Sequence, residues 1–152
     1  MAQSEAHLVG TQAYLEKLTH ARVTLRQKVI AVMKTQMFAL AEYVRANKLS
    51  GQVLNRRSGD LSRATTGQIM EAGEQRVVGV VGTQGIPYAP VHEFGWNGER
   101  TVSQAFGRPI VPRSVQFHYP ERSFIRSSVA DRKDDILQAF RSTAEAFARG
   151  ES

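Results

Sequence analysis

Apolar residues recur at helical spacing through the first third of the chain. From about Thr11 to Ala46 they fall three, four or seven positions apart, as on one face of an α-helix. The residues on this face are Leu15, Leu18, Leu25, Val29, Met33, Met37, Leu40 and Val44. A helix of about 30 residues is roughly 45 Å long, which is more than one small core requires. We therefore predict an amphipathic helix that covers the core and rests in part on a partner.

Two short strands are predicted after this helix. The helical pattern ends within residues 47–62, a stretch with glycine, serine and arginine that indicates a mobile basic loop. Gly67–Ala72 and Arg76–Val81 then have the residue types of strands, and Gly73-Glu74 between them favours a hairpin.

The second half of the chain is predicted to contain an arm, a strand and a helix. Residues 96–114 contain tryptophan, glycine and proline without sustained periodicity, which is typical of a binding loop, and we interpret them as an interaction arm. Alternating apolar and polar residues predict a strand over Val115–Tyr119 that closes the sheet. Ser128–Asp131 has the spacing of a capping box, so a helix is predicted from there to about Ala148.

These elements predict a single α+β domain over residues 1–152. It consists of a long N-terminal helix, a small antiparallel β-sheet with an extended arm, and a C-terminal helix. A chain of 152 residues that is 41% hydrophobic is large enough to bury a core. The lack of cysteine excludes disulfides and thiolate chemistry. No apolar run has the length of a membrane span, so we expect no membrane partner.

The net charge of +6 is concentrated in two basic stretches. They cover residues 45–63 and 100–126, with a more acidic segment between them. Such stretches could bind DNA phosphates, contact an acidic neighbouring subunit, or be solvent-exposed loops without a partner. The candidates for a DNA channel or a basic partner surface are Arg56, Arg57, Arg63, Arg108 and Arg113.

His92-Glu93 is the pair that most invites a chemical interpretation, because imidazole and carboxylate can share a proton or bind a cation. No second histidine follows four positions after the first, so a zinc site is not predicted. Gly79, Gly82 and Gly85 follow a strand, but neither the lysine nor the long helix of a nucleotide-binding loop comes next. We expect no catalytic residue, no metal and no cofactor.

Residues 88–95 are predicted to form one short helical turn. Tyr88, Val91 and Phe94 lie three positions apart, which would bury two rings and a valine under the sheet. Gly95 would then permit a left-handed backbone exit from the turn.

Glu93 in this turn needs either exposure or a cationic partner, because an unpaired buried charge is costly. Arg122 is the predicted partner, since it follows the closing strand. The pairing is a hypothesis about structure and assigns no chemistry to either residue.

Four short motifs, in order, carry a family resemblance. They are Ser58-Gly59-Asp60-Leu61, Val81-Gly82-Thr83, Tyr88-Ala89 leading to Glu93-Phe94-Gly95, and Arg122-Ser123-Phe124. Together they resemble the tail-completion or virion-morphogenesis family of tailed bacteriophages, which includes neck proteins and proteins like minor tail protein Z. The resemblance covers about residues 54–130. Ser58 stands where the family usually has threonine and Ser123 where it has proline, so fine contacts are not carried over.

The resemblance implies a structural virion protein of the neck or tail end, assembled in the bacterial host cytoplasm. Copies of the chain would form a ring, commonly hexameric, that completes the tail and joins it to the head connector. DNA would pass through the ring without sequence-specific contacts. The partners would be further copies, the connector or head-closure protein, and the tail tube or terminator protein. We expect the long helix and the arm to contact neighbours, with Trp96, Phe106 and Ile110 as anchors.

Two other structural functions stay open. A head-closure protein or a tail-tube or terminator protein is the nearer alternative, because fold alone does not decide which joint such a protein occupies. A non-specific DNA-binding module is more distant, since the chain shows no DNA-reading motif, and its affinity would depend strongly on salt. An enzyme is the least favoured class.

Overall fold

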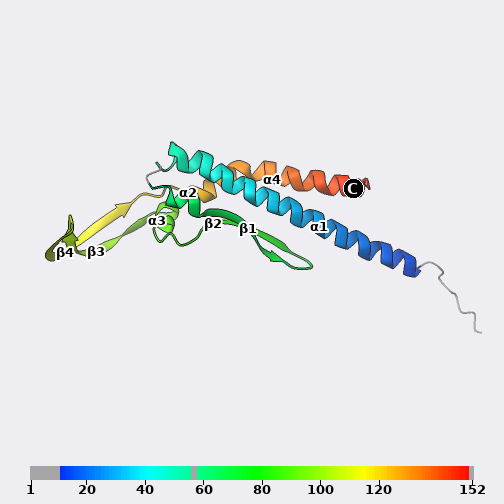
Figure 1. Ribbon diagram of the computed structural model, residues 1–152, viewed down its shortest axis with the longest axis horizontal. Coiled ribbons are helices and arrows are strands. Elements are labelled where there is room, and N and C mark those ends of the chain that lie inside the picture. Colours follow the sequence, from blue (N-terminus) through cyan, green and yellow to red (C-terminus); the bar gives the residue numbers. More distant parts are fainter. Residues whose placement is uncertain (1–10, 56–57, 151–152) are drawn as a thin grey trace, which may run out of the picture.

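The computed structural model describes residues 11–55 and 58–150 (Figure 1). Helix α1 (Thr11–Tyr43) continues into a π-helical segment, η1 (Val44–Gln52). A short helix, α2 (Asp60–Ala64), precedes the strands β1 (Thr65–Ala72) and β2 (Val77–Thr83). The remaining elements are α3 (Ala89–Phe94), β3 (Trp96–Ala105), β4 (Arg108–Tyr119) and α4 (Ile125–Ala148). The predicted α+β class, with a long first helix and a helix at the C-terminal end, is confirmed.

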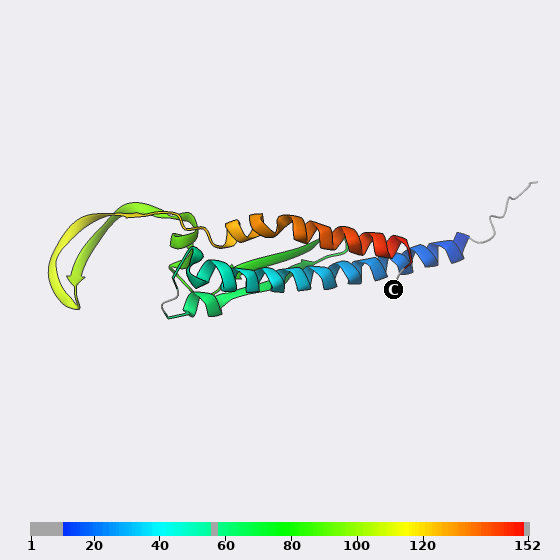
Figure 2. The same ribbon diagram turned by 90° about the horizontal axis from the view of Figure 1, so that it is seen from above.

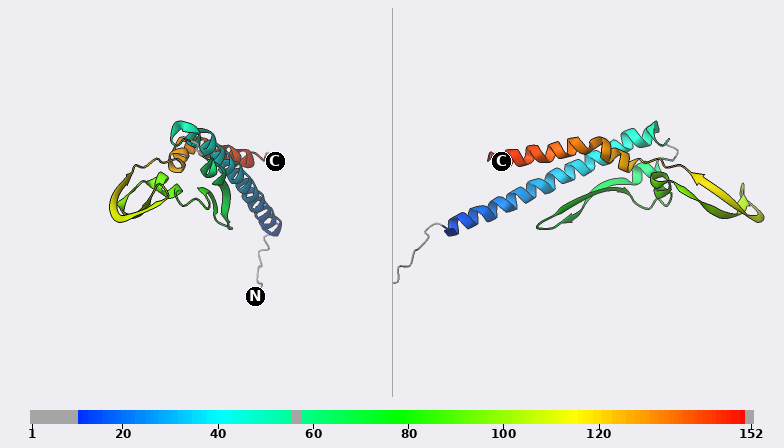
Figure 3. Two further views of the ribbon diagram at one scale, coloured as in Figure 1. Left: turned by 60° about the vertical axis from the view of Figure 1, so that its left-hand side comes forward. Right: turned by 180° about the vertical axis from the view of Figure 1, so that it is seen from behind.

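The elements form an elongated body with a projection at each end. Helices α1 and α4 lie side by side and antiparallel, and the β1–β2 hairpin packs against another side of α1 (Figures 1 and 2). The β3–β4 hairpin projects from the end near α2 and α3, while the first turns of α1 project from the opposite end (Figure 3). In the described chain the hairpins form two separate two-stranded sheets, so the prediction that residues 115–119 close one sheet is wrong.

The β1–β2 hairpin lies directly on α1 because glycines face the helix. Its antiparallel register places Gly67 opposite Val81 and Ile69 opposite Gly79. A methyl group added to Gly67 would lie 2.1 Å from the carbonyl oxygen of Met37, and one added to Gly79 would lie 2.6 Å from the Met37 Cγ atom. Only glycine therefore permits this close contact between strand backbone and helix.

The turn of the β1–β2 hairpin is held to α1 by two arginines. The Arg26 guanidinium donates hydrogen bonds to the carbonyl oxygens of Ala72 and of Gly73, the second at 3.1 Å. Arg22 forms an ion pair with Glu74 at 3.1 Å. Arg22 lies seven residues before Val29 and Arg26 seven residues before Met33, so both arginines are on the same side of α1 as the apolar positions, where the returning hairpin packs.

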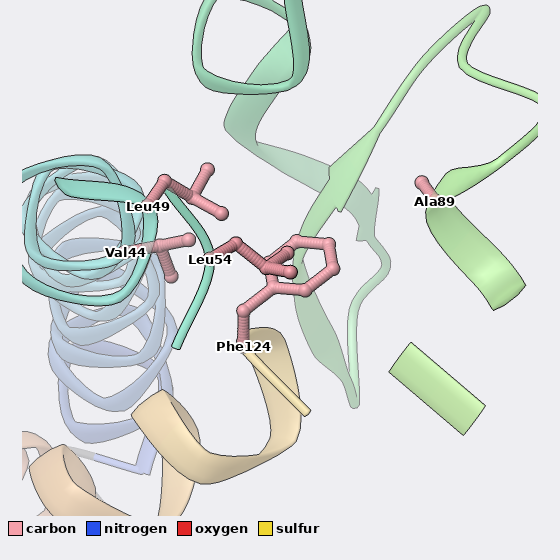
Figure 4. Packing of buried hydrophobic residues seen from close by; sticks show 5 residues of the cluster. All are labelled: Val44, Leu49, Leu54, Ala89 and Phe124. Atoms are coloured by element: carbon pink, nitrogen blue, oxygen red, sulfur yellow. The ribbon is translucent and has the colours of Figure 1, made fainter. Parts of the chain in front are cut away.

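The hydrophobic core lies where η1, α3 and the start of α4 meet (Figure 4). Phe124 and Val44 are fully buried there. The buried residues of this cluster are Val44, Leu49, Leu54, Ala89 and Phe124. The third residue of the Arg122-Ser123-Phe124 motif thus joins the last helix to the end of the first helical region.

Helical structure reaches further along the chain than the sequence pattern indicates. The backbone N–H groups of Val53 and Leu54 both donate to the carbonyl oxygen of Lys48, at 3.2 and 3.0 Å, and complete the helix end. The helical region thus ends at Gln52, and α2 occupies residues 60–64. The prediction that the helix ends near residue 46 and that residues 47–62 form a loop is therefore wrong for much of this segment.

Residues 96–114 belong to a β-hairpin and not to an irregular stretch. Strands β3 and β4 pair from Trp96 opposite Tyr119 to Ala105 opposite Arg108, with a register shift beyond Val102. A two-residue turn, Phe106-Gly107, joins them with φ values of 51° and 74°, as in the tight turns that suit hairpins. The segment does project as an arm (Figures 1 and 2), but it has regular structure.

Candidate functional site

The best-formed polar site of the described chain surrounds the carboxylate of Glu93. Helix α3 places this residue under the first turn of α4, where it is only 4% exposed. Its oxygens accept backbone N–H hydrogen bonds from Phe124 at 2.8 Å and from Ile125 and Arg126 at 2.9 Å. The Ser123 hydroxyl donates another at 2.8 Å. Glu93 therefore caps the N-terminus of α4 from a distant part of the sequence.

Two opposing effects set the pKa of Glu93. Burial raises it, whereas hydrogen bonds from the backbone of Ile125, Arg126 and Phe124 and from the Ser123 hydroxyl lower it by more, so that the pKa falls below its ordinary value of 4.5. The dipole of α4 also favours a negative charge at this end of the helix. The buried side chain is therefore ionised at neutral pH.

Acidification is expected to weaken the fold through this carboxylate. Because its pKa is lower in the folded than in the unfolded state, its contribution to stability is complete above about pH 4.5 and is lost as the pH falls through the folded-state pKa. The free energy of unfolding, measured by urea denaturation between about pH 7 and 3, tests this for the wild type and Glu93→Gln. The gap between the two proteins should narrow below about pH 4.5; a constant gap would contradict the prediction.

The predicted pairing of Glu93 with Arg122 is wrong. The guanidinium beside Glu93 belongs to Arg126, whose Nε atom lies 3.2 Å from the carboxylate and whose Nη2 atom donates to the Glu93 carbonyl oxygen at 2.9 Å. Arg126 also pairs with Glu121 at 2.6 Å. Arg122 instead donates its backbone N–H to the carbonyl oxygen of His92 at 2.7 Å. The partner is Arg126 because the carboxylate lies under the helix turn that contains this residue.

The predicted cap of the C-terminal helix is also wrong. The helix begins at Ile125, so Ser128 lies inside its first turns, where it is buried and its hydroxyl donates to the carbonyl oxygen of Phe124 at 2.6 Å. The capping group is the carboxylate of Glu93.

Helix α3 turns its aromatic side chains outwards. Tyr88 and Phe94 are exposed, whereas Ala89 and Glu93 are buried, so the prediction that the rings pack under the sheet is wrong. The Phe94 ring instead lies 4.7 Å from the guanidinium carbon of Arg126, in a cation–π contact. The buried face of this short helix is thus selected by the carboxylate that caps α4.

Gly95 precedes β3 with a positive φ of 70°, but its ψ of 172° is extended, so the exit from the turn is not the predicted left-handed conformation. A methyl group on this residue would lie 2.9 Å from both the Tyr119 carbonyl oxygen and the Glu121 backbone nitrogen. The chain just before β3 and the chain just after β4 therefore come into close contact at Gly95. Gly59, in the Ser58-Gly59-Asp60-Leu61 motif, also has positive φ, at 82°, and precedes α2.

A cleft of about 570 Å³ lies beside this junction. Tyr88, His92, Tyr119 and Arg122 line it, together with apolar side chains from the end of the first helical region. Burial lowers the pKa of His92, and the positive charge of Arg122 lowers it further, so the imidazole is neutral at pH 7.

Ser58 and Asp60 line the same cleft, but their side chains are hydrogen-bonded to each other. The Ser58 hydroxyl donates to the Asp60 carboxylate at 2.5 Å, and Arg63 pairs with the other carboxylate oxygen. In the described chain no hydrogen bond joins the His92 ring to either residue. The described residues also contain no group of three or more His, Asp or Glu side chains able to hold a metal ion.

The register of the β3–β4 hairpin gives it two unlike faces, because directly opposite residues share a face. The first, here called the apolar face, carries Trp96, Gly98, Arg100 and Val102 opposite Tyr119, Phe117, Val115 and Arg113. The second, the polar face, carries Asn97, Glu99 and Thr101 opposite His118, Gln116 and Ser114. Rings pack along the apolar face, with centroids 6.2 Å apart for Trp96 and Tyr119 and 6.0 Å apart for Phe117 and Tyr119.

The three candidate anchors do not form one patch. Trp96 lies at the base of the hairpin, half-buried, with its ring over Gly98. Phe106 lies in the turn at the tip and is fully exposed, and Ile110 is half-buried on β4. The structure thus separates Trp96 and Phe106 by the length of the hairpin.

The basic candidates are also spread over different elements. Arg63 lies on α2 in its ion pair with Asp60. Arg108 and Arg113 are exposed on β4, and within residues 11–55 and 58–150 neither has a carboxylate partner. Arg56 and Arg57 lie outside the described residues.

Sequence reasoning missed Arg126 and the first half of the apolar face. The residues next to Arg126 in the sequence do not indicate its function, because its partner, Glu93, belongs to another helix, α3. The apolar face does have one: Trp96, Gly98 and Val102 continue the two-residue alternation of Val115–Tyr119 on the other strand. Glycine and arginine interrupt that alternation and hide it in the linear sequence.

Among the helices that the structure describes, none has a stretch both long and apolar enough to cross a lipid bilayer. Comparison of the chain with protein-family profiles, with curated proteins and with solved structures finds no match.

Proposed function

We propose that this chain is a structural subunit of the neck or tail end of a tailed bacteriophage. Copies would form a ring, hexameric in the family that the motifs resemble, which completes the tail and joins it to the head connector. The proposal rests on the order of the sequence motifs and on one structural observation. The subunit extends two elements in opposite directions, and each carries apolar side chains that a lone subunit leaves in water (Figure 1).

The exposed apolar residues support an assembly function. Several of them lie at the two ends of the molecule: Tyr14, Leu15 and Leu18 on α1 at one end, and Phe106 and Val111 on the β3–β4 hairpin at the other, while others, such as Phe38 and Met70, lie on the body between. Clusters of this kind on a protein surface mark sites that another protein covers. A subunit that meets neighbours at both ends is suited to a ring.

Charge supports a passage for DNA without sequence readout. The chain has a net charge of +6, and the exposed arginines Arg108 and Arg113 extend along β4. Such side chains attract phosphates of any sequence, and the attraction weakens with salt. The channel residues within this proposal are these two arginines together with Arg56, Arg57 and Arg63.

Electron microscopy of lysates tests the proposed function directly. In a phage or prophage in which this gene alone is disrupted, we expect filled heads beside separate tails, with infectious particles restored when the full chain is supplied in trans. Abnormally long tails would favour the alternative of a tail terminator. Intact infectious particles without the gene would remove the virion function altogether.

A further inference from the structure

The cleft beside Gly95 has an apolar wall that is continuous with the hydrophobic core. Its volume of about 570 Å³ is typical of sites that hold a ligand. Leu49 and Leu54, two members of the core cluster, line it (Figure 4), together with Val53 and Leu61. A large apolar side chain from another molecule can therefore reach the core through this cleft.

Among the described residues that line the cleft, one positive charge is left without a partner. The Asp60 carboxylate is paired with Arg63 and accepts a hydrogen bond from Ser58, and the imidazole of His92 is neutral at pH 7. Arg122 is exposed, and within the described chain its guanidinium has no carboxylate partner. Its charge acts on the cleft, because it contributes to the lowered pKa of His92.

Two tyrosines stand at the rim of the cleft. Tyr88 and Tyr119 are 44% and 46% exposed, so their rings can contact a bound molecule while their hydroxyl groups stay in water. The Tyr88 ring lies edge-on to the ring of His92, with centroids 5.8 Å apart, and the Tyr119 ring stacks on Phe117. Tyrosine and arginine are enriched among the side chains that dominate binding energy in protein interfaces. This composition favours a protein segment as the occupant.

We propose that the cleft binds a short peptide segment of a partner protein, with an acidic side chain on Arg122 and a large apolar side chain against Leu49 and Leu54. A carboxylate suits a single guanidinium, because the two can form parallel hydrogen bonds. A phosphate group carries more negative charge than one guanidinium balances, and a basic segment would meet a like charge. The site goes beyond the proposed ring, since it does not depend on which joint of the particle the chain occupies.

An NMR titration of the full-length chain tests the site with a defined probe, the peptide acetyl-Leu-Ser-Glu-Ser-Leu-amide. Alternate side chains of an extended peptide point the same way, so its glutamate and both leucines face the cleft together. Addition to about 10 mM, which detects even weak binding, should shift the backbone amide signals of Gly59, His92 and Arg122. The peptides acetyl-Leu-Ser-Gln-Ser-Leu-amide and acetyl-Ala-Ser-Glu-Ser-Ala-amide should each bind roughly tenfold more weakly, because one lacks the charge and the other the apolar groups.

Arg122→Gln provides the second measurement. It should weaken binding of the glutamate peptide by roughly tenfold and leave binding of the glutamine peptide unchanged, which a defect in folding would not do. Arg113→Gln is the matched control, because Arg113 is also exposed and without a carboxylate partner in the described chain but does not line the cleft. This variant should bind the glutamate peptide as the wild type does.

Four results would overturn the inference. They are no shift of the three cleft signals at the highest peptide concentration, equal binding of the three peptides, equal losses from Arg122→Gln and Arg113→Gln, and shifts of the same size from acetate alone, which would mean that the site takes any small anion. The proposed function is judged separately by the lysates. Separate heads and tails together with a failed titration would keep the neck function and reject only this binding site.

Discussion

Replacing Glu93 by glutamine is expected to lower the free energy of unfolding by about 3 kcal/mol. The carboxylate accepts hydrogen bonds from three successive backbone N–H groups of residues 124–126 and from the Ser123 hydroxyl. A glutamine has only one acceptor oxygen, and its amide N–H groups would face the N–H donors of the helix. Because the site is buried, water cannot replace what is lost. Thermal unfolding should shift down by roughly 10 °C for a chain of this size.

Glu121→Gln is the matched control for this variant. Glu121 shares the partner Arg126 at 2.6 Å, but its side chain is 53% exposed and accepts no backbone hydrogen bond from α4 in the described structure. Its removal should therefore change stability by no more than about 0.5 kcal/mol. Equal unfolding temperatures for Glu93→Gln and the wild type would show that the carboxylate does not hold the helix.

Gly67→Ala is expected to be as damaging, at about 3 kcal/mol, for a steric reason. The new methyl group would lie 2.1 Å from the Met37 carbonyl oxygen, and this atom belongs to the backbone of α1. A helix backbone cannot rotate aside as a flexible side chain can, so the β1–β2 hairpin and α1 must separate. Urea denaturation of the purified variant measures the loss.

Gly82→Ala tests the same substitution in the same hairpin without the clash. A methyl group on Gly82 would meet no atom within 4 Å, so stability should stay within about 0.5 kcal/mol of the wild type. If both variants matched the wild type, the close packing of α1 on β1 would be wrong. If both were equally destabilised, the cause would be strand conformation and not the helix contact.

The elements with strong periodicity were predictable from the sequence. The spacing from Leu15 to Val44 identified the first helix, and the valines of residues 77–81 identified the hairpin that packs against it. Of the β3–β4 hairpin only residues 115–119 were predicted as a strand, because glycines and the prolines Pro109 and Pro112 leave residues 96–114 without sustained periodicity. A two-stranded sheet tolerates them, since each strand has a free edge where no backbone N–H is needed.

The polar junction was predictable only in part. The sequence identified Glu93 as a charged residue that needs a partner, and it suggested the side chain of Arg122. In the structure, most of the hydrogen bonds to Glu93 come instead from backbone N–H groups at the start of α4. Every residue except proline has the same backbone N–H group, so the amino-acid types in a sequence do not reveal which of these groups will bind a distant carboxylate. For the same reason a local capping box at Ser128 seemed sufficient, although the helix begins earlier, at Ile125.

The position of Glu93 at the roots of the hairpin has a mechanical consequence. Strand β3 leaves the body directly after Gly95, and β4 returns through residues 120–123 into the helix end that the carboxylate holds. Both strands of the hairpin therefore leave the body next to the helix end that this carboxylate caps. The base of the hairpin and the first turn of α4 thus share one anchor, so loss of the Glu93 carboxylate is expected to loosen both together.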